Sequence, residues 1–216
     1  MDNFFFSPAG QRTQAQTALV AVLHSHDGID LAHELMLAWA PRVPAAAMST
    51  VLVAGIGDLE GVLEQIAYRL GPAGLDVSCL GLAGVGGGEE TALQLVFGQT
   101  ALKCAGVVVC GDDLPPLQFS EQRPVVARAK LRLVWTADDP LLCAQALGDL
   151  LRLLRASGLD AQGTVLPRQD CPPREPGGRP VPPLPLMRLG GSYLAELVAV
   201  ALDAASRPHV RPLGTG

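Results

Sequence analysis

Short apolar runs of strand length alternate along this chain with longer segments in which leucine and alanine recur every three or four residues. Alternation of this kind predicts parallel strands joined by helices, because parallel strands need long crossovers and are buried on both faces. We therefore expect an α/β three-layer sandwich, a mostly parallel sheet of about six or more strands with helices on both faces. The expected strands are 18–23, 50–54, 75–83, 105–110, 131–136 and 161–166, and the expected helices are 29–40, 58–70, 88–98, 141–157 and 192–205.

Length and composition favour one well-buried core. The chain has 216 residues, of which 49% are hydrophobic and 17% charged, and that is ordinary for a single domain. We expect one domain over 1–206 and a flexible tail over 207–216. Between them, 167–188 is rich in proline and is expected to form an extended surface loop. That loop is either a rigid connection or a polyproline segment that docks on a partner.

Several helix boundaries have local signals. Asp30, Asp58 and Asp139 have side chains that accept hydrogen bonds from free N–H groups at a helix start, so each is an expected N-cap. Pro140 follows the last of these at the first helical position, which suits proline. Gly158 is the expected stop of the fourth helix.

Charge and cysteine content limit the classes of binding partner and the cellular location that we expect. The 16 basic and 21 acidic residues give a net charge of -5 without a Lys/Arg cluster, so we expect neither nucleic acid nor membrane as a partner. Five cysteines without a C-x-x-C pair predict reduced thiols and a cytoplasmic location. The first residues carry an acid where a signal peptide is basic, and no apolar run approaches the roughly 18 residues of a membrane helix.

The most informative motif spans 77–93, where an apolar strand runs through a glycine-packed turn into a helix start. This backbone pattern is typical of a nucleophile elbow, which needs small residues around one exposed nucleophilic side chain. The turn contains no serine, cysteine or threonine. It therefore keeps the scaffold of the elbow without its chemistry.

Three stretches together resemble the phospholipase/carboxylesterase branch of the α/β-hydrolase superfamily. The segment 18–28, Ala-Leu-Val-Ala-Val-Leu-His-Ser-His-Asp-Gly, is similar to the strand and His-Gly turn that help build that family's oxyanion hole. The segment 82–95 is similar to its elbow and following helix. The segment 132–141, Arg-Leu-Val-Trp-Thr-Ala-Asp-Asp-Pro-Leu, resembles the strand and Asp-Pro turn that present the triad acid. The resemblance covers about 18–166 and implies the α/β-hydrolase fold.

The resemblance also implies roles for single residues. The family's G-x-S-x-G places its flanking glycines at Gly84 and Gly88 and its serine at Gly86, which has no atom to attack a carbonyl. It places the triad acid at Asp139, whereas the stretch after the last strand, 166–172, has no histidine to act as base. A triad acts as a unit, so the acid is a remnant without its partners.

What remains is a crevice at the carboxyl ends of the strands. We expect a catalytically inactive protein that binds a small acyl compound or a protein partner, including a second copy of itself, without a cofactor or metal. The expected binding residues are His24, Ser25, His26, Gly84, Val85, Gly87 and Gly88.

Two other functions stay open. The first is an active hydrolase of carboxylic esters or thioesters with an unconventional site, which would use Cys171 or a metal held by His24 and His26. The second is a Rossmann-like nucleotide-binding protein, since 51–61 reads as a strand followed by Gly-x-Gly and a helix. Asp58 and Glu60 oppose a bound phosphate in that turn, so they are better explained as helix-start charges.

Glu89 and Glu90 follow the elbow directly. Carboxylates at this point oppose the oxyanion that acyl transfer develops. They are expected either as solvated charges at a helix start or, for one of them, as a base acting on water.

Overall fold

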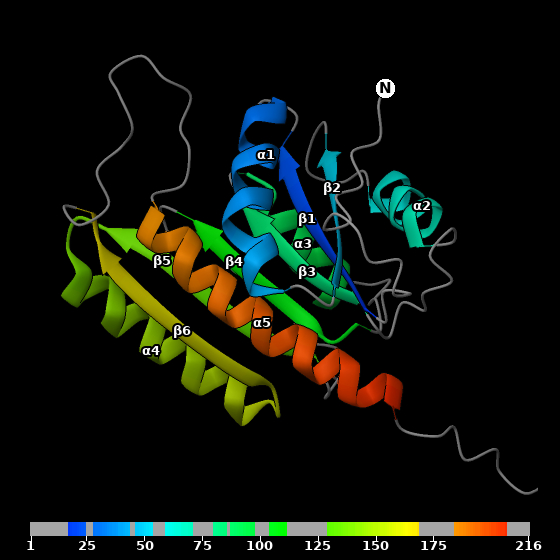
Figure 1. Cartoon of the computed structure of the whole chain (residues 1–216). Coiled ribbons are helices and arrows are strands. Elements are labelled where there is room, and N and C mark those ends of the chain that lie inside the picture. The colour runs from blue at the N-terminus through cyan, green and yellow to red at the C-terminus, as the bar shows by residue number, and fades with distance from the viewer. Residues whose placement is uncertain are drawn as a thin grey trace, which may run out of the picture.

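The computed structural model describes residues 17–24, 28–43, 46–53, 59–70, 80–85, 87–97, 104–111, 129–168 and 184–206. Within them, six parallel strands form one sheet in the order β2-β1-β3-β4-β5-β6. Figure 1 shows this twisted sheet with helices on both faces. The strands are β1 Thr17–His24, β2 Ala46–Val53, β3 Leu80–Val85, β4 Gly106–Gly111, β5 Lys130–Ala137 and β6 Asp160–Pro167.

The helices connect these strands in the expected alternation. They are α1 Gly28–Trp39, the short 3-10 helix η1 Ala40–Arg42, α2 Leu59–Leu70, α3 Glu89–Phe97, α4 Pro140–Ala156 and α5 Leu184–Ser206. The α/β three-layer expectation is therefore confirmed.

Successive residues of each strand pack on opposite faces of the sheet, so the molecule has two apolar layers. In β1, Val20 and Val22 face the layer under α2, α3 and α4, whereas Leu19 and Leu23 face the layer under α1 and α5. Both layers are buried from solvent here, since all four of these side chains are at most 1% exposed. Figure 1 shows α1 and α5 crossing the same face.

The chain changes direction across the sheet after β1. The crossover from β1 to β2 moves one way and the later crossovers move the other way, so right-handed connections place α1 on the face opposite α3 and α4. The carboxyl ends of β1 and β3 flank this switch point, where open α/β sheets bind their ligands.

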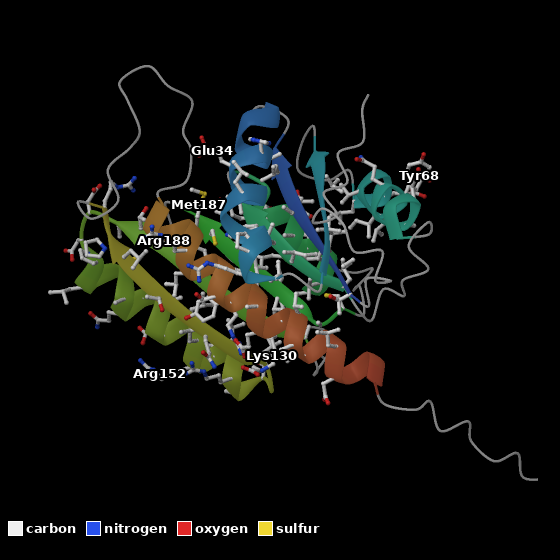
Figure 2. All side chains as sticks on the ribbon, in the orientation of Figure 1. Glu34, Tyr68, Lys130, Arg152, Met187 and Arg188 are labelled. Atoms are coloured by element: carbon white, nitrogen blue, oxygen red, sulfur yellow. The ribbon has the colours of Figure 1, made fainter. Side chains whose placement is uncertain are left out.

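Helix α5 is fixed to α1 by close backbone approach. The Trp39 indole Nε1 donates a 2.8 Å hydrogen bond to the carbonyl of Met187, which Figure 2 labels near the start of α5. A Cβ atom on Gly191 would lie 2.9 Å from Trp39 Cδ1 and 2.7 Å from Arg42 Cδ. Glycine at this position therefore lets the two helices touch.

Most predicted boundaries lie within two residues of the observed ones, and the exceptions are the starts of β2, at 46 rather than 50, of β3 and of α5. Strand β3 runs over Leu80–Val85 rather than 75–83, and 75–79 lie outside the described residues. Gly84 and Val85 consequently belong to the strand and not to the turn. Helix α1 begins at Gly28, so the prediction that Asp30 caps it was wrong.

The predicted proline-rich loop, 167–188, overlaps described elements at both ends, and 169–183 lie outside the described residues. Pro167 is the last residue of β6, and 184–188 already belong to α5, whose expected start was 192. Pro185 lies in the first helical turn, where its missing N–H would have no helical partner in any case. No helix in the described ranges is long and apolar enough to cross a membrane.

Candidate functional site

A tight turn connects β3 to α3 at the switch point. The Gly88 N–H donates to the Val85 carbonyl at 3.0 Å, and the Ala92 N–H donates to the Gly88 carbonyl at 3.0 Å to begin the helix. Gly87 between them has a φ of +88°, a left-handed conformation that favours glycine. Gly86, where the resemblance places the nucleophile, lies outside the described residues.

The two flanking glycines bring α3 directly onto the sheet. A Cβ atom on Gly84 would lie 2.8 Å from Ala92 Cβ, and one on Gly88 would lie 2.0 Å from the carbonyl oxygen of Val22 in β1. Neither position has room for a side chain. The elbow backbone is thus built as a close contact of β3, α3 and β1.

The first residue of α3 turns its carboxylate back onto this elbow. The Gly87 N–H donates to Glu89 Oε2 at 2.5 Å, and the Glu89 residue is half-buried. Its neighbour Glu90 is exposed and accepts a 3.1 Å hydrogen bond from Gln94. The two acids were expected either as solvated charges or, for one of them, as a base acting on water, and the structure gives them different environments.

The Glu89 carboxylate reaches over the carboxyl ends of the neighbouring strands. A Cβ atom on Gly111, the last residue of β4, would lie 3.1 Å from Glu89 Oε1 and 3.1 Å from the indole Nε1 of Trp135. Trp135 itself is fully buried. Glycine at position 111 therefore leaves the space that the carboxylate occupies.

Cys110 precedes Gly111, and its side chain packs in the layer under α1 and α5, where a Cβ atom on Gly190 would lie 2.8 Å from its Sγ. Burial raises the pKa of its thiol far above the ordinary value, and the negative charge of Glu89 raises that pKa further. Cys104 at the other end of β4 is also buried, and burial raises the pKa of its thiol to about 11. Both stay protonated at neutral pH, so neither is an activated nucleophile.

At the end of β5, Asp139 is an N-cap. Its carboxylate accepts a 3.0 Å hydrogen bond from the Leu142 N–H, with Pro140 opening α4, as the sequence predicted. The neighbouring Asp138 instead pairs with Arg168, at 2.9 Å between Oδ1 and Nε. Arg168 follows β6 directly, in the stretch where the resemblance expects a histidine.

Several predicted site residues cannot be placed. The side chain of His24 and the residues Ser25, His26 and Cys171 lie outside what the structure describes. Within the described ranges, no three His, Cys, Asp or Glu side chains gather in a way that could hold a metal ion.

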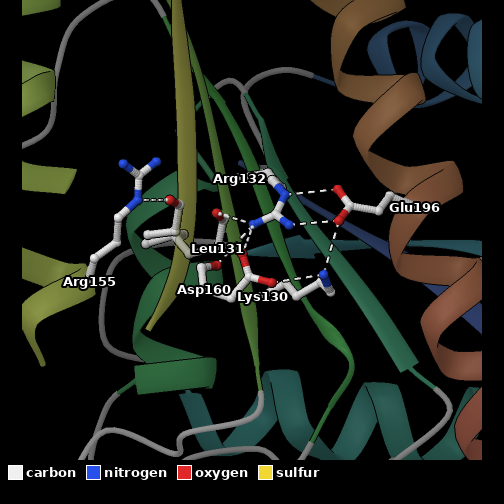
Figure 3. A network of polar contacts seen from close by, with 7 residues as sticks. Lys130, Leu131, Arg132, Arg155, Asp160 and Glu196 are labelled. Atoms are coloured by element: carbon white, nitrogen blue, oxygen red, sulfur yellow. Dashed lines mark hydrogen bonds and ion pairs between the residues drawn. The ribbon is translucent and has the colours of Figure 1, made fainter. Parts of the chain in front are cut away.

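A charged network that the sequence did not reveal lies at the opposite, amino edge of the sheet (Figure 3). The guanidinium of Arg132 in β5 donates to both carboxylate oxygens of Glu196 in α5, at 2.9 and 2.7 Å. It also donates to Asp160 Oδ1 at 3.0 Å. Lys130 Nζ contacts both acids, at 2.8 Å from Asp160 and 3.0 Å from Glu196.

The network shifts the titration of all four groups. A hydrogen bond from Lys130 lowers the pKa of Asp160, and one from Arg132 lowers the pKa of Glu196. The hydrogen bond to Asp160 raises the pKa of Lys130. Burial opposes the charge on Arg132, but its bonds to Glu196 and Asp160 outweigh that effect and raise its pKa. The network lies away from the elbow, so we assign it to stability.

Solved structures, two of them esterases, share this backbone arrangement. A thermostable esterase is similar with a TM-score of 0.56 and 15% identity over 94% of this chain and 61% of that one. The structure of YahD with malic acid has a TM-score of 0.56 and 15% identity, and the match covers 91% of this chain and 100% of that one. A Pyrobaculum calidifontis esterase has a TM-score of 0.56 and 12% identity, and the match covers 95% of this chain and 85% of that one. This chain spans less than two thirds of the first of these esterases.

These likenesses establish the α/β-hydrolase fold for this chain. No protein-family model and no curated protein sequence matches it. Fold does not determine activity, so function has to be argued from the site.

Proposed function

We propose that this esterase-like α/β-hydrolase-fold protein does not hydrolyse esters and instead binds a small acyl compound at the carboxyl edge of its sheet. The nearest functional description is a carboxylesterase-like protein that has become a pseudoenzyme. The observation that carries the proposal is the chemistry at the ends of β5 and β6.

A serine hydrolase needs an acid that orients an imidazole, which then takes a proton from the nucleophile. Here the carboxylate of Asp139 caps the start of α4, and the carboxylate of Asp138 forms an ion pair with the guanidinium of Arg168. Arginine stays protonated in proteins and has no lone pair to accept a proton. Together with a glycine at position 86, this arrangement supports binding without turnover.

The elbow supports the same proposal. In hydrolases of this fold, the backbone N–H after the nucleophile stabilises the oxyanion of the tetrahedral intermediate. The corresponding N–H belongs to Gly87 and is bonded to the Glu89 carboxylate. A fixed negative charge at that donor opposes a developing one.

Covalent labelling tests the proposal. A fluorophosphonate reacts with an activated serine, so intact-protein mass spectrometry after incubation with excess reagent should show only the unmodified mass. A single adduct would contradict the proposal, and ester turnover that is lost in Cys171→Ala would assign the alternative, an active hydrolase that uses this thiol. Loss of ester turnover on adding a chelator would assign the other alternative, a metal at His24 and His26.

A protein partner is the second candidate, favoured by two exposed leucines beside the carboxyl edge. Leu141 and Leu142 in the first turn of α4 are 85% and 66% exposed. If a second copy binds there, Leu141→Asp with Leu142→Asp should convert a dimer into a monomer in analytical ultracentrifugation. Leu153→Asp, which changes another exposed leucine of the same helix, is the matched control.

The proposal places the protein in the cytoplasm. Among the described residues, Cys104 and Cys110 are buried thiols that form no disulfide, which supports a reducing compartment. Fractionation of the source cells, followed by detection of the protein in each fraction, tests this placement. Recovery outside the cytoplasmic fraction would contradict it.

A further inference from the structure

The carboxylate of Glu89 has a seat built from two separate parts of the fold. On one side, its Oε2 accepts the Gly87 N–H at 2.5 Å, which is shorter than the roughly 2.9 Å common for N–H···O hydrogen bonds. On the other side, a Cβ atom built on Gly111 would lie 3.1 Å from Oε1 and 3.1 Å from the indole Nε1 of Trp135. The helix start supplies the first contact and the ends of β4 and β5 supply the second.

Both halves of the seat depend on glycine. Gly87 turns its N–H toward the carboxylate with a φ of +88°. At Gly111, a single added methyl would lie 3.1 Å from Oε1, closer than carbon and oxygen normally pack. The carboxylate therefore occupies space that this backbone keeps open.

We infer that Glu89 is an internal anion that determines the specificity of the carboxyl edge. It fills the position that a ligand oxyanion would take at the Gly87 N–H, so the site excludes carboxylates and other oxyanions and accepts uncharged acyl compounds. This inference rests on the proposed function in one respect, namely that the carboxyl edge binds a ligand.

The exclusion follows from two effects. A ligand anion that approached the Gly87 N–H would meet an occupied donor. It would also meet the like charge of the Glu89 carboxylate at close range. An uncharged amide or ester meets no such repulsion and leaves the seat intact.

The experiment uses the full chain labelled with [15N]glycine and compares butyrate with butyramide, which have the same carbon skeleton and differ in charge. The wild-type Gly87 amide proton should resonate far downfield, as expected for a short bond to a carboxylate. Millimolar butyramide should shift glycine resonances at the elbow, whereas butyrate should leave them unchanged.

Three variants locate the effect. In Glu89→Ala, the Gly87 amide should move upfield and butyrate should then bind at least about tenfold more tightly than it binds wild type. Glu90→Ala removes the same charge from the adjacent, exposed position and should behave like wild type. Gly111→Ala keeps the charge but crowds Oε1, so the Gly87 amide should move in the same direction as in Glu89→Ala.

Each contrary result overturns the inference. An unchanged Gly87 amide in both Glu89→Ala and Gly111→Ala would show that the contact does not exist. Equal butyrate responses in wild type and Glu89→Ala, or none in either, would show that Glu89 excludes nothing. Ester hydrolysis on the same samples keeps the proposals apart, because turnover by wild type would refute the proposed function while the amide shifts still decide the role of Glu89.

Discussion

The guanidinium of Arg132, fully buried in β5, forms a two-pronged contact with the carboxylate of Glu196 on α5. The residues lie 64 positions apart and hold the last helix against the amino edge of the sheet. The ion pair compensates both charges. Without the carboxylate, the guanidinium would be a buried charge with less compensation. This contact leads to two predictions about stability.

Glu196→Ala should lower the free energy of unfolding by about 2 kcal/mol, measured by urea denaturation. A wholly buried pair would cost roughly 3–5 kcal/mol, but Glu196 is partly exposed and Asp160 still contacts Arg132. Asp149→Ala is the control, because it breaks an exposed ion pair with Arg152 and should cost at most about 0.5 kcal/mol. Equal losses in the two variants would refute the role of the network.

Acid should weaken the fold through the same network. Asp160 and Glu196 have pKa values below their ordinary 3.8 and 4.5, so the folded state releases protons more readily than the unfolded state. Their contribution is complete above those ordinary values and is lost as pH falls through the lowered ones. Between pH 5 and pH 2, Glu196→Gln should therefore lose stability less steeply than wild type, as measured by urea midpoints at each pH. Parallel slopes would contradict this assignment.

Gly88→Ala should be severely destabilising, because its methyl would collide with the backbone of β1 at Val22. We expect a loss of about 3 kcal/mol or more in urea denaturation. The matched control is Gly148→Ala in α4, where a Cβ meets nothing within 4 Å. That variant should gain about 0.5–1 kcal/mol, since alanine favours a helix interior. A tolerated Gly88→Ala would show that α3 does not touch β1 as described.

Asp139→Ala should cost about 1 kcal/mol, the usual loss for an N-cap. Asp139→Asn keeps an acceptor for the Leu142 N–H and should cost only a few tenths of a kcal/mol. Thermal unfolding of both variants beside wild type measures the difference. Equal losses would mean that the charge of Asp139 matters for something other than the cap.

Gly86→Ser alone should not create an esterase, because the stretch 166–172 has no histidine to take the proton from the new hydroxyl, and the Glu89 carboxylate at the elbow is already bonded to the Gly87 N–H. Hydrolysis of p-nitrophenyl butyrate by purified Gly86→Ser, compared with wild type, measures this. Robust turnover would mean that a base reaches the elbow from residues outside the described ranges.

The sequence predicts the fold well because its signals are local. The apolar runs of β1 and β5 and the Asp139-Pro140 start of α4 each depend on neighbouring residues. It predicts β2 poorly, since Ala46–Ser49 are weakly apolar and join the strand by pairing with β1. It predicts the start of α5 eight residues too late, at 192 rather than 184, because proline disfavours a helix interior, although the first helical turn tolerates it.

The site was harder to predict because its contacts are not local. The spacing of the glycines identified the elbow, and Glu89 was recognised as an acid beside it. Which N–H the carboxylate takes depends on the φ of Gly87 and on the space at Gly111, 22 residues beyond Glu89 in the sequence. The Asp138–Arg168 pair likewise depends on β5 and β6 being neighbours.

The most direct test of the central proposal is hydrolysis of p-nitrophenyl butyrate by purified wild-type protein, followed to low rates beside a boiled control, with and without a chelator. We predict a rate equal to that of the boiled control in both conditions, since the resemblance places a glycine at the nucleophile position and no histidine at the base position. Saturable turnover above the control would contradict the account and make this protein an enzyme.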